Sequence, residues 1–362
     1  MIVTMLCPHH DSDEKIVSRS IGFCSDCVRT GSMEIAQQTH ERLRRRDSLV
    51  PVIPANGENV CSECGNHCRM SENDVGFCNI RIVREGKIVD RYTERAVVSW
   101  YFDPLPTNCV ADWVCPVTTE QELGIGRKRL KNLAVFYGSC NSDCLFCQNA
   151  SYRIMMARGE PLMTAQELAD VADDYTACVC YFGGDPACNP EHSVKTSQLL
   201  NETKTVKVCY ETNGNISKKW LDAITDIVET TGGTFKFDLK AVTPQIYQAL
   251  TGVSNTVVLR NFKQLASSKR EREGEFLVAS ILLVPGYIDV PELQRICTFI
   301  AENDSSIPTA FLGFSPHHAM SDLPRTSMAH ARAAQDIAKE AGLENVRIGN
   351  LGLLGRSDYK FN

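Results

Sequence analysis

Short apolar runs alternate with amphipathic stretches along the chain from residue 133 onward. The apolar runs are rich in β-branched and aromatic residues, as expected for buried strands. The stretches between them repeat apolar residues at the three- and four-residue spacing of a helix that packs on one face. This alternation predicts repeated βα units and a parallel sheet. The predicted strands are residues 133–137, 177–182, 206–211, 234–239, 275–284 and 310–314.

Helix signals fall between these strands. Thr164-Ala-Gln-Glu167 has the pattern of a capping box and predicts the start of the first long helix. Residues 290–302 and 327–341 are strongly periodic, and Gly342 is expected to end the second of these helices. Six βα units predict an α/β fold, a partial (βα)6 TIM-like barrel with active-site residues at the carboxyl ends of the strands.

Before residue 133 the chain is rich in cysteines and turns, with only short strand-like pieces. Since domains usually run from about 50 to 250 residues, a chain of 362 residues has room for one large and one or two small units. We expect a small metal-binding element at 1–50, a cysteine-rich leader domain at 51–130 and the barrel at 131–362.

The most informative motif is a cysteine loop that follows the first predicted strand. Cys140, Cys144 and Cys147 form a C-x3-C-x2-C pattern. Iron–sulfur clusters usually bind one cysteine at each iron, so three thiolates would leave one iron of a [4Fe–4S] cluster open to another ligand. The alternative is a zinc knuckle, which prefers paired C-x2-C elements and four local ligands.

Two further groups in the N-terminal part have metal-ligand spacing. Cys7, His10, Cys24 and Cys27 predict a small structural zinc site, in which His9 is an alternative to His10 and free buried thiols are the alternative to a metal. Cys61, Cys64, Cys68 and Cys78 form a C-x2-C-x3-C-x9-C set. Zinc and an auxiliary [4Fe–4S] cluster both accept four cysteines, so both remain open.

The remaining cysteines have no such spacing. We expect Cys109 and Cys115 to pack or to line a substrate pocket rather than to bind metal. Buried free cysteines often act as small apolar residues, and this role is expected for Cys178, Cys180, Cys188, Cys209 and Cys297. Cys188 lies in a loop from which its thiol could reach the pocket.

Composition limits the function further. The net charge of −6 offers no basic face for nucleic acid, and the arginine-rich run at 42–46 is expected to be a solvated helix face. The 17 cysteines follow no secretion signal, and no run approaches the roughly 18 to 20 apolar residues of a membrane span. These features predict a cytoplasmic chain with reduced thiols and no membrane contact.

Residues 55–355 resemble the radical S-adenosylmethionine (SAM) superfamily, in the branch of pyruvate formate-lyase activating enzymes and AmmeMemoRadiSam-system radical SAM proteins. The resemblance rests on the cysteine loop ending in Cys-Gln-Asn149, Gly183-Gly-Asp-Pro186, Asp238-Leu-Lys-Ala241, Val284-Pro-Gly286 and Ile348-Gly-Asn350. Departures from the family pattern are Asp185 in place of glutamate, the 108–115 insertion and the Cys7–Cys27 element.

The resemblance implies a role for residues around SAM. Cys140, Cys144 and Cys147 would hold the [4Fe–4S] cluster, and the residues implied to bind SAM are Phe146, Gly183, Gly184, Asp185, Asn213, Lys240 and His318. Phe146 would lie beside the adenine, and Lys240 would pair with the SAM carboxylate as a compact cation. His318 is as readily explained as a structural histidine.

The implied activity is reductive cleavage of SAM and hydrogen abstraction from a substrate that the sequence does not identify. A flavodoxin- or ferredoxin-like protein is implied as reductant, with a small molecule, a peptide or a protein as substrate. The alternatives are an activase for a glycyl-radical enzyme, a radical SAM methyltransferase, and a non-catalytic iron–sulfur electron carrier. Electron carriers saturate their clusters with protein ligands, so the three-cysteine loop disfavours the last of these.

Overall fold

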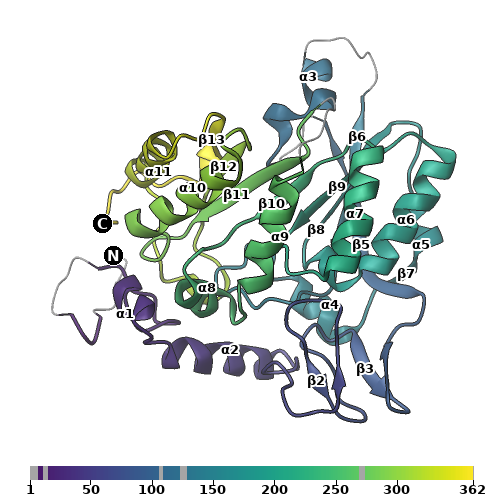
Figure 1. Ribbon diagram of the computed structural model, residues 1–362, viewed down its shortest axis with the longest axis horizontal. Coiled ribbons are helices and arrows are strands. Elements are labelled where there is room, and N and C mark those ends of the chain that lie inside the picture. The colour runs from purple at the N-terminus through teal and green to yellow at the C-terminus, as the bar shows by residue number, and fades with distance from the viewer. Residues whose placement is uncertain (1–6, 11–14, 106–108, 123–128, 269–273, 362) are drawn as a thin grey trace.

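The computed structural model describes residues 7–10, 15–105, 109–122, 129–268 and 274–361 (Figure 1). Its centre is a curved sheet of nine strands within these residues. In spatial order the strands are β13 (Val346–Gly349), β12 (Thr309–Gly313), β11 (Leu277–Leu283), β10 (Phe235–Asp238), β9 (Lys207–Thr212), β8 (Thr176–Phe182), β6 (Lys131–Tyr137), β5 (Arg95–Pro104) and β7 (Leu162–Thr164).

Every neighbouring pair from β6 to β13 is parallel, whereas β5 is antiparallel to both β6 and β7. All six predicted strands are present, with ends within three residues of the predicted ones. The sheet has two free ends, β13 and β7. The predicted α/β fold, a partial barrel with a cysteine-rich N-terminal extension, is therefore confirmed.

Helices cover the outer face of this sheet (Figure 1). They are α6 (Pro190–Thr203), α7 (Lys218–Thr230), α9 (Thr256–Ala266), α10 (Val290–Asp304) and α11 (Met328–Glu340). The shorter α4 (Tyr152–Arg158), α5 (Ala165–Ala169) and α8 (Pro244–Thr251) follow β6, β7 and β10. None of the helices in the described ranges is long and apolar enough to span a bilayer.

The capping box at Thr164 is present, but the helix that it opens is short. The backbone N–H of Glu167 donates to Thr164 Oγ1 at 3.1 Å, and the N–H of Thr164 donates to the Glu167 carboxylate at 2.7 Å. Helix α5 nevertheless ends at Ala169, so the prediction of a long helix was wrong. A capping box satisfies the first N–H groups of a helix and has no influence on where the helix ends.

The N-terminal part contributes to the same body. Strand β5, from the segment predicted as leader, pairs with β6 from Val98 opposite Tyr137 to Pro104 opposite Lys131. Helices α1 (Ser25–Arg29) and α2 (Glu34–Arg46) lie against α8 along one edge (Figure 1). Two small hairpins, β1 (Asn59–Val60) with β2 (Arg69–Met70) and β3 (Arg81–Arg84) with β4 (Lys87–Asp90), form the cysteine-rich leader.

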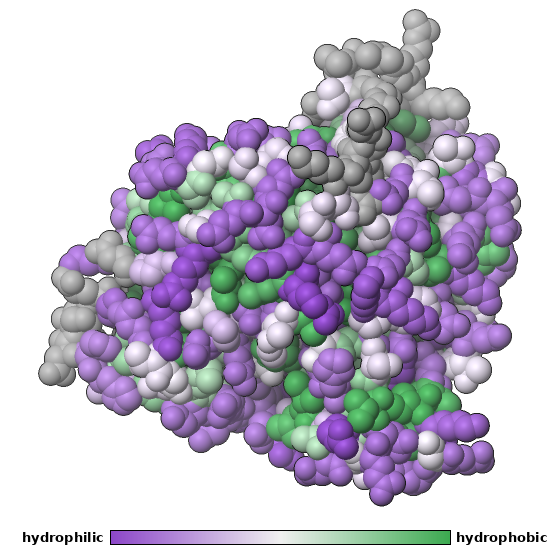
Figure 2. Space-filling model, in the orientation of Figure 1, coloured by the Kyte–Doolittle hydropathy of each residue, from purple (hydrophilic) through white to green (hydrophobic). Residues whose placement is uncertain are grey.

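The surface in the same orientation is mostly hydrophilic (Figure 2). Apolar colour gathers over the leader hairpins at the lower right of that view. Val60 and Val89 of β1 and β4 are among the exposed apolar side chains, at 46% and 39%.

Candidate active site and metal centres

The cysteine loop lies at the carboxyl end of β6, between that strand and α4. Its three thiols, from Cys140, Cys144 and Cys147, line a cavity of about 540 Å³ inside the curved sheet. Cys140 and Cys144 are buried, and Cys147 is half-buried. The cysteine loop therefore lies where the sequence predicted it, at the carboxyl end of a barrel strand.

Hydrogen bonds with helix α8 and with the segment after β9 fix the conformation of this loop. The N–H of Asp143 donates to Thr251 O at 2.8 Å, and the N–H of Leu145 donates to Leu250 O at 2.9 Å. Asn213 Nδ2, after β9, donates to Asn141 Oδ1 at 2.9 Å and lies 3.9 Å from Cys140 Sγ. The Asn213 side chain thus supports the cluster loop itself, although the residue also lines the cavity.

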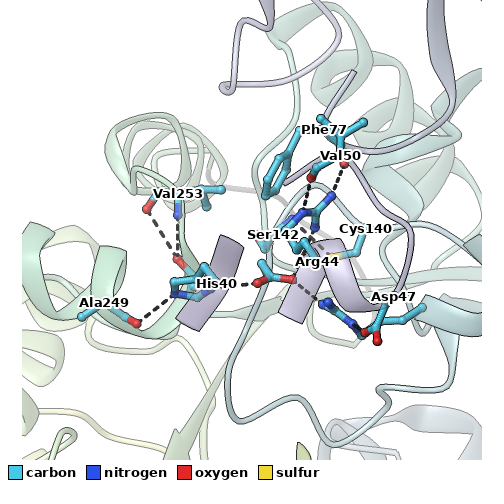
Figure 3. A network of polar contacts seen from close by, with 12 residues as sticks. His40, Arg44, Asp47, Val50, Phe77, Cys140, Ser142, Ala249 and Val253 are labelled. Atoms are coloured by element: carbon cyan, nitrogen blue, oxygen red, sulfur yellow. Dashed lines mark hydrogen bonds and ion pairs between the residues drawn. The ribbon is translucent and has the colours of Figure 1, made fainter. Parts of the chain in front are cut away.

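A buried ionic network holds the loop from behind. Asp143 is 1% exposed and accepts hydrogen bonds from His40 Nδ1 at 2.8 Å, from Arg44 Nη1 at 3.3 Å and from Arg153 Nη1. Figure 3 shows His40 and Arg44 pointing from α2 toward the loop. Burial opposes ionisation of Asp143, but the His40 hydrogen bond and the two arginine charges hold its pKa below the ordinary value.

Arg42, Arg45 and Arg46 are exposed, as expected for a solvated helix face, but the prediction was wrong for Arg44. Arg44 is fully buried, lies 3.6 Å over the Phe77 ring and donates to Phe77 O at 2.6 Å. His40 and Arg44 stand four residues apart, so they share the face of α2 that also buries Ala36 and Leu43. The four-residue spacing of His40 and Arg44 could be read from the sequence, but their contact with Asp143 could not.

The glycine turn after β8 packs directly against the cluster loop. Gly184 has φ +53°, and a Cβ at this position would lie 2.2 Å from the carbonyl oxygens of Tyr137 and Ser139. The N–H of Asp185 donates to Ser139 O at 2.7 Å. Only glycine allows this close approach of two backbones, so the turn brings its own backbone to the cavity wall, where Gly183 also lies.

Asp185 lines the cavity, and three neighbouring groups donate hydrogen bonds to its carboxylate. It accepts from the backbone N–H groups of Ala187 at 2.9 Å and Asn213 at 2.7 Å, and from Thr212 Oγ1 at 2.8 Å. Burial raises the pKa of Asp185 to about 6 in spite of these bonds. The shorter acid therefore ties the ends of β8 and β9 together and positions the glycine turn.

Two further predicted residues face the cavity. Phe146 and Lys240 both line it, and Lys240 Nζ lies 5.4 Å from the centre of the Phe146 ring. Lys240 is buried and forms an ion pair with Asp238. Burial alone would lower the pKa of Lys240, but the Asp238 carboxylate raises it, so the side chain carries a positive charge.

His318 lies away from these groups. It begins a short 3-10 helix, His318–Met320, and does not line the cavity formed by the described residues. Burial and the charge of Arg153 lower its pKa to about 4. The adjoining Ala319 N–H donates to Leu145 O at 3.1 Å, so this segment supports the cluster loop from the side.

The leader cysteines gather next to the cluster loop. Burial raises the pKa of Cys61, Cys64 and Cys68, and the charge of Cys78 raises it further. Asn66, between the second and third of them, donates to Asn141 O at 2.7 Å. A hydrogen bond with the Cys188 thiol and the charge of Arg81 lower the pKa of Cys78 to about 6. Cys188 therefore reaches the leader rather than the pocket.

Cys7, His10, Cys24 and Cys27, called the N-terminal group below, bring their ligand atoms as close together as the ligands of a metal site. Within the described ranges it is the only set of three or more His, Cys, Asp or Glu residues whose ligand atoms all lie within 4.8 Å. Cys7 and Cys27 sulfurs lie 3.7 Å apart, and His10 Nδ1 lies 3.5 Å from Cys24 Sγ and 3.3 Å from Cys27 Sγ. His9 instead packs on Phe23, so His10 is the ligand candidate.

The donor set in the cavity fits a [4Fe–4S] cluster with SAM beside it. Three thiols come from one loop, and the glycine turn and a buried cation, Lys240, face the same space. Pockets of about 300 to 1,000 Å³ accommodate ligands of the size of SAM. This arrangement is the one expected of a class of proteins that bind a cluster through three cysteines.

Comparison with known proteins agrees with this class. Residues 134–298 match the Radical SAM superfamily, and they form a radical SAM domain. Over 305 residues the chain is 27% identical to Uncharacterized protein MJ0808 of Methanocaldococcus jannaschii, covering 83% of this chain and 84% of that protein. The predicted resemblance to the superfamily is confirmed.

Activating enzymes are also among the similar proteins. The Indoleacetate decarboxylase activating enzyme of Tractidigestivibacter scatoligenes is 24% identical over 181 residues, which are 48% of this chain and 53% of that enzyme. A domain of the pyruvate-formate lyase-activating enzyme from Bacteroides vulgatus superimposes with a TM-score of 0.39 at 20% identity, covering 48% of this chain and 99% of that domain. The activating-enzyme branch is supported by the first of these similarities.

Proposed function

We propose that this chain is a radical SAM enzyme that abstracts hydrogen from a substrate bound inside the partial barrel. Cys140, Cys144 and Cys147 would hold the [4Fe–4S] cluster. When bound and reduced by a flavodoxin- or ferredoxin-like protein, the cluster supplies the electron that splits SAM into methionine and a 5′-deoxyadenosyl radical. The convergence of the three thiols on a cavity that also contains Phe146 and Lys240 carries the proposal.

Residues of the chain would orient SAM in this cavity. Lys240 has three N–H donors and uses one on Asp238, so it can also donate to the SAM carboxylate. The SAM amino group would bind the backbone of Gly183 and Gly184. The hydrogen bonds of the Asp185 carboxylate would hold that backbone in place. Phe146 would pack against the adenine.

The rest of the cavity suits a substrate with polar groups. Beyond the cysteine loop its wall includes Asp103, Glu211, Lys236 and Arg347, together with Trp113. A few polar groups in a ligand pocket fix the orientation of the ligand. A small polar molecule or a peptide segment would fit this description.

A more specific candidate is an activase that creates a glycyl radical on a partner enzyme. It is favoured by the similarity to an enzyme named as an activating enzyme, which covers about half of each chain. In that case the substrate is a peptide loop of the partner, which would enter the same cavity.

Incubation of the anaerobic, reconstituted protein with SAM and dithionite tests the proposed function. We expect 5′-deoxyadenosine and methionine in equal amounts, because one cleavage releases both. If SAM stays intact while the cluster is shown to be reduced, the proposed activity is wrong. A radical signal on an added glycyl-radical enzyme would favour the activase.

We further propose that zinc occupies the N-terminal group of Cys7, His10, Cys24 and Cys27, and that the leader cysteines hold a second metal or an auxiliary cluster. Cys24 precedes α1, in which Ser25 Oγ donates to Asp289 Oδ2 at 2.7 Å. Tyr287 OH donates to Phe23 O at 3.2 Å. A zinc ion would therefore fix the segment that docks on the loop between β11 and α10.

Replacing Cys24→Ser and Cys27→Ser is expected to remove about one zinc ion per chain and to lower the melting temperature. Structural zinc contributes directly to the folding of small elements. The iron content should stay unchanged, because these residues lie outside the cluster loop. Cys297→Ser, in the buried face of α10, is the control. Equal zinc in the double variant and the control would contradict the assignment.

A further inference from the structure

The hydroxyl of Tyr247, on α8, is buried without a hydrogen-bond partner. The Tyr247 side chain is fully buried, and among the described residues its hydroxyl oxygen is one of four buried side-chain nitrogen or oxygen atoms that make no hydrogen bond. Two of the others belong to Arg29 and Arg153, whose remaining guanidinium nitrogens are bonded, and the last belongs to Thr225. Because an unpartnered buried hydroxyl is costly, an acceptor other than these protein atoms is expected beside Tyr247.

Helix α8 places this tyrosine next to the cluster loop. At the end of the helix, the carbonyl oxygens of Leu250 and Thr251 accept hydrogen bonds from the backbone N–H groups on either side of Cys144. Tyr247 precedes Leu250 and Thr251 by three and four residues, so the three side chains share one face of α8. All three are buried. The ring of Tyr247 therefore lies one helical turn from the backbone that holds Cys144.

The charges that act on this hydroxyl are those of the proposed cluster site. Burial raises the pKa of Tyr247, the positive charge of Lys240 opposes this shift, and the charge of Cys144 adds to it. The phenol therefore keeps its proton at neutral pH and can only gain a bond by donating it or by accepting one. A neutral thiol is a weak acceptor, but a thiol that binds metal loses its proton and becomes a strong one.

Tyr247 approaches Cys144 from the side of the loop and not from the space for SAM. The described residues that line the large cavity include Cys144 and Lys240, but not Tyr247. Lys240 already forms an ion pair with Asp238. The remaining acceptor that suits the buried hydroxyl is thus the sulfur of Cys144 in its metal-bound form.

We propose that Tyr247 donates a hydrogen bond to the Cys144 thiolate when the cluster is bound, and that this bond makes the cluster easier to reduce. Hydrogen bonds to the ligand sulfurs help to set the reduction potential of an iron–sulfur cluster, because they stabilise the more negative, reduced state. Tyr247 acts through a ligand, so it is a positioning residue that touches neither SAM nor substrate. The inference rests on the proposed [4Fe–4S] cluster of the cysteine loop.

The test is Tyr247→Phe in the full-length, anaerobically reconstituted protein, which removes the hydroxyl and keeps the ring. Iron and sulfide are measured first, and the reduction potential is then determined without SAM by a titration followed by electron paramagnetic resonance. The signal of the loop cluster is the one missing from the Cys140→Ala, Cys144→Ala, Cys147→Ala variant. We expect full iron content and an about tenfold lower ratio of reduced to oxidised cluster at a fixed potential, a shift of about 59 mV to more negative values.

Tyr181→Phe is the matched control. It removes a buried hydroxyl on the outer face of the sheet, where Tyr181 OH lies 2.9 Å from Ser197 Oγ. Its reduction potential should equal that of the parent. An unchanged potential in Tyr247→Phe would overturn the proposal, as would loss of the cluster iron in this variant. A shift that appears only after SAM is added would also overturn it, because the acceptor would then be SAM. A parent without iron at the cysteine loop would instead contradict the proposed function.

A second measurement uses the Cys140→Ala, Cys144→Ala, Cys147→Ala variant, in which the proposed acceptor is absent. In this background Tyr247→Phe should keep or raise the melting temperature, because no hydrogen bond is lost. Tyr181→Phe should lower it, because the contact with Ser197 is removed. If Tyr247→Phe lowers the melting temperature as much as Tyr181→Phe, the hydroxyl has a partner within the protein itself and the proposal is wrong.

Discussion

Replacing Cys140→Ala, Cys144→Ala and Cys147→Ala together is expected to abolish SAM cleavage. The variant should lose about four irons per chain, because these thiolates are the protein ligands of the proposed cluster. Even residues that only support a metal ligand change activity by about 10- to 100-fold. We therefore expect the yield of 5′-deoxyadenosine to fall by more than about a hundredfold.

The matched control for this variant is Cys297→Ala, which removes a buried thiol far from the loop in sequence, on α10. It should keep both the iron and the 5′-deoxyadenosine yield of the parent. Undiminished SAM cleavage by the triple variant would show that another cysteine group supports the chemistry. The leader cysteines would then be the place to look.

The second large effect is expected for Asp143→Ala. This change leaves Arg44, which is fully buried, and Arg153, which is 3% exposed, without their shared carboxylate. Removing one partner of a buried ion pair costs about 3 to 5 kcal/mol. For a chain of this size we expect the melting temperature to fall by on the order of 10 °C, and the cluster loop to bind iron poorly.

Asp174→Ala provides the comparison for this prediction. Asp174 is 93% exposed and pairs with Lys204 at 3.5 Å. Surface pairs of this kind contribute roughly 0 to 1 kcal/mol, so its melting temperature should stay close to that of the parent. If Asp143→Ala melts as late as Asp174→Ala, the network behind the cluster loop has no role in stability.

The strands and the cysteine loop were predictable from the sequence because their signals are local. A buried strand of a parallel sheet is a short apolar run, and the C-x3-C-x2-C spacing fits within one loop. The N-terminal group could be predicted for the same reason, because it is built from C-x2-H and C-x2-C pairs. The structure then showed that its ligand atoms lie close together. The glycine turn could be placed because it follows a strand.

Contacts between distant segments were not predictable in this way. Arg44 looked like part of a solvated charged run, but its partner lies 99 residues further along the chain. Cys180 looked like an apolar filler, because nothing near it in sequence announces Lys236, 56 residues away. Asp185 looked like a shortened SAM ligand, and only the fold revealed that three neighbours donate hydrogen bonds to its carboxylate.

We propose above that the three-cysteine loop supports reductive SAM cleavage in the cavity it lines. The most direct measurement is the amount of 5′-deoxyadenosine formed from SAM under dithionite, with the parent protein and the Cys140→Ala, Cys144→Ala, Cys147→Ala variant assayed side by side without oxygen. We expect 5′-deoxyadenosine from the parent and only the background amount from the variant. Equal amounts from both proteins, or none from a parent whose cluster is intact and reduced, would contradict it.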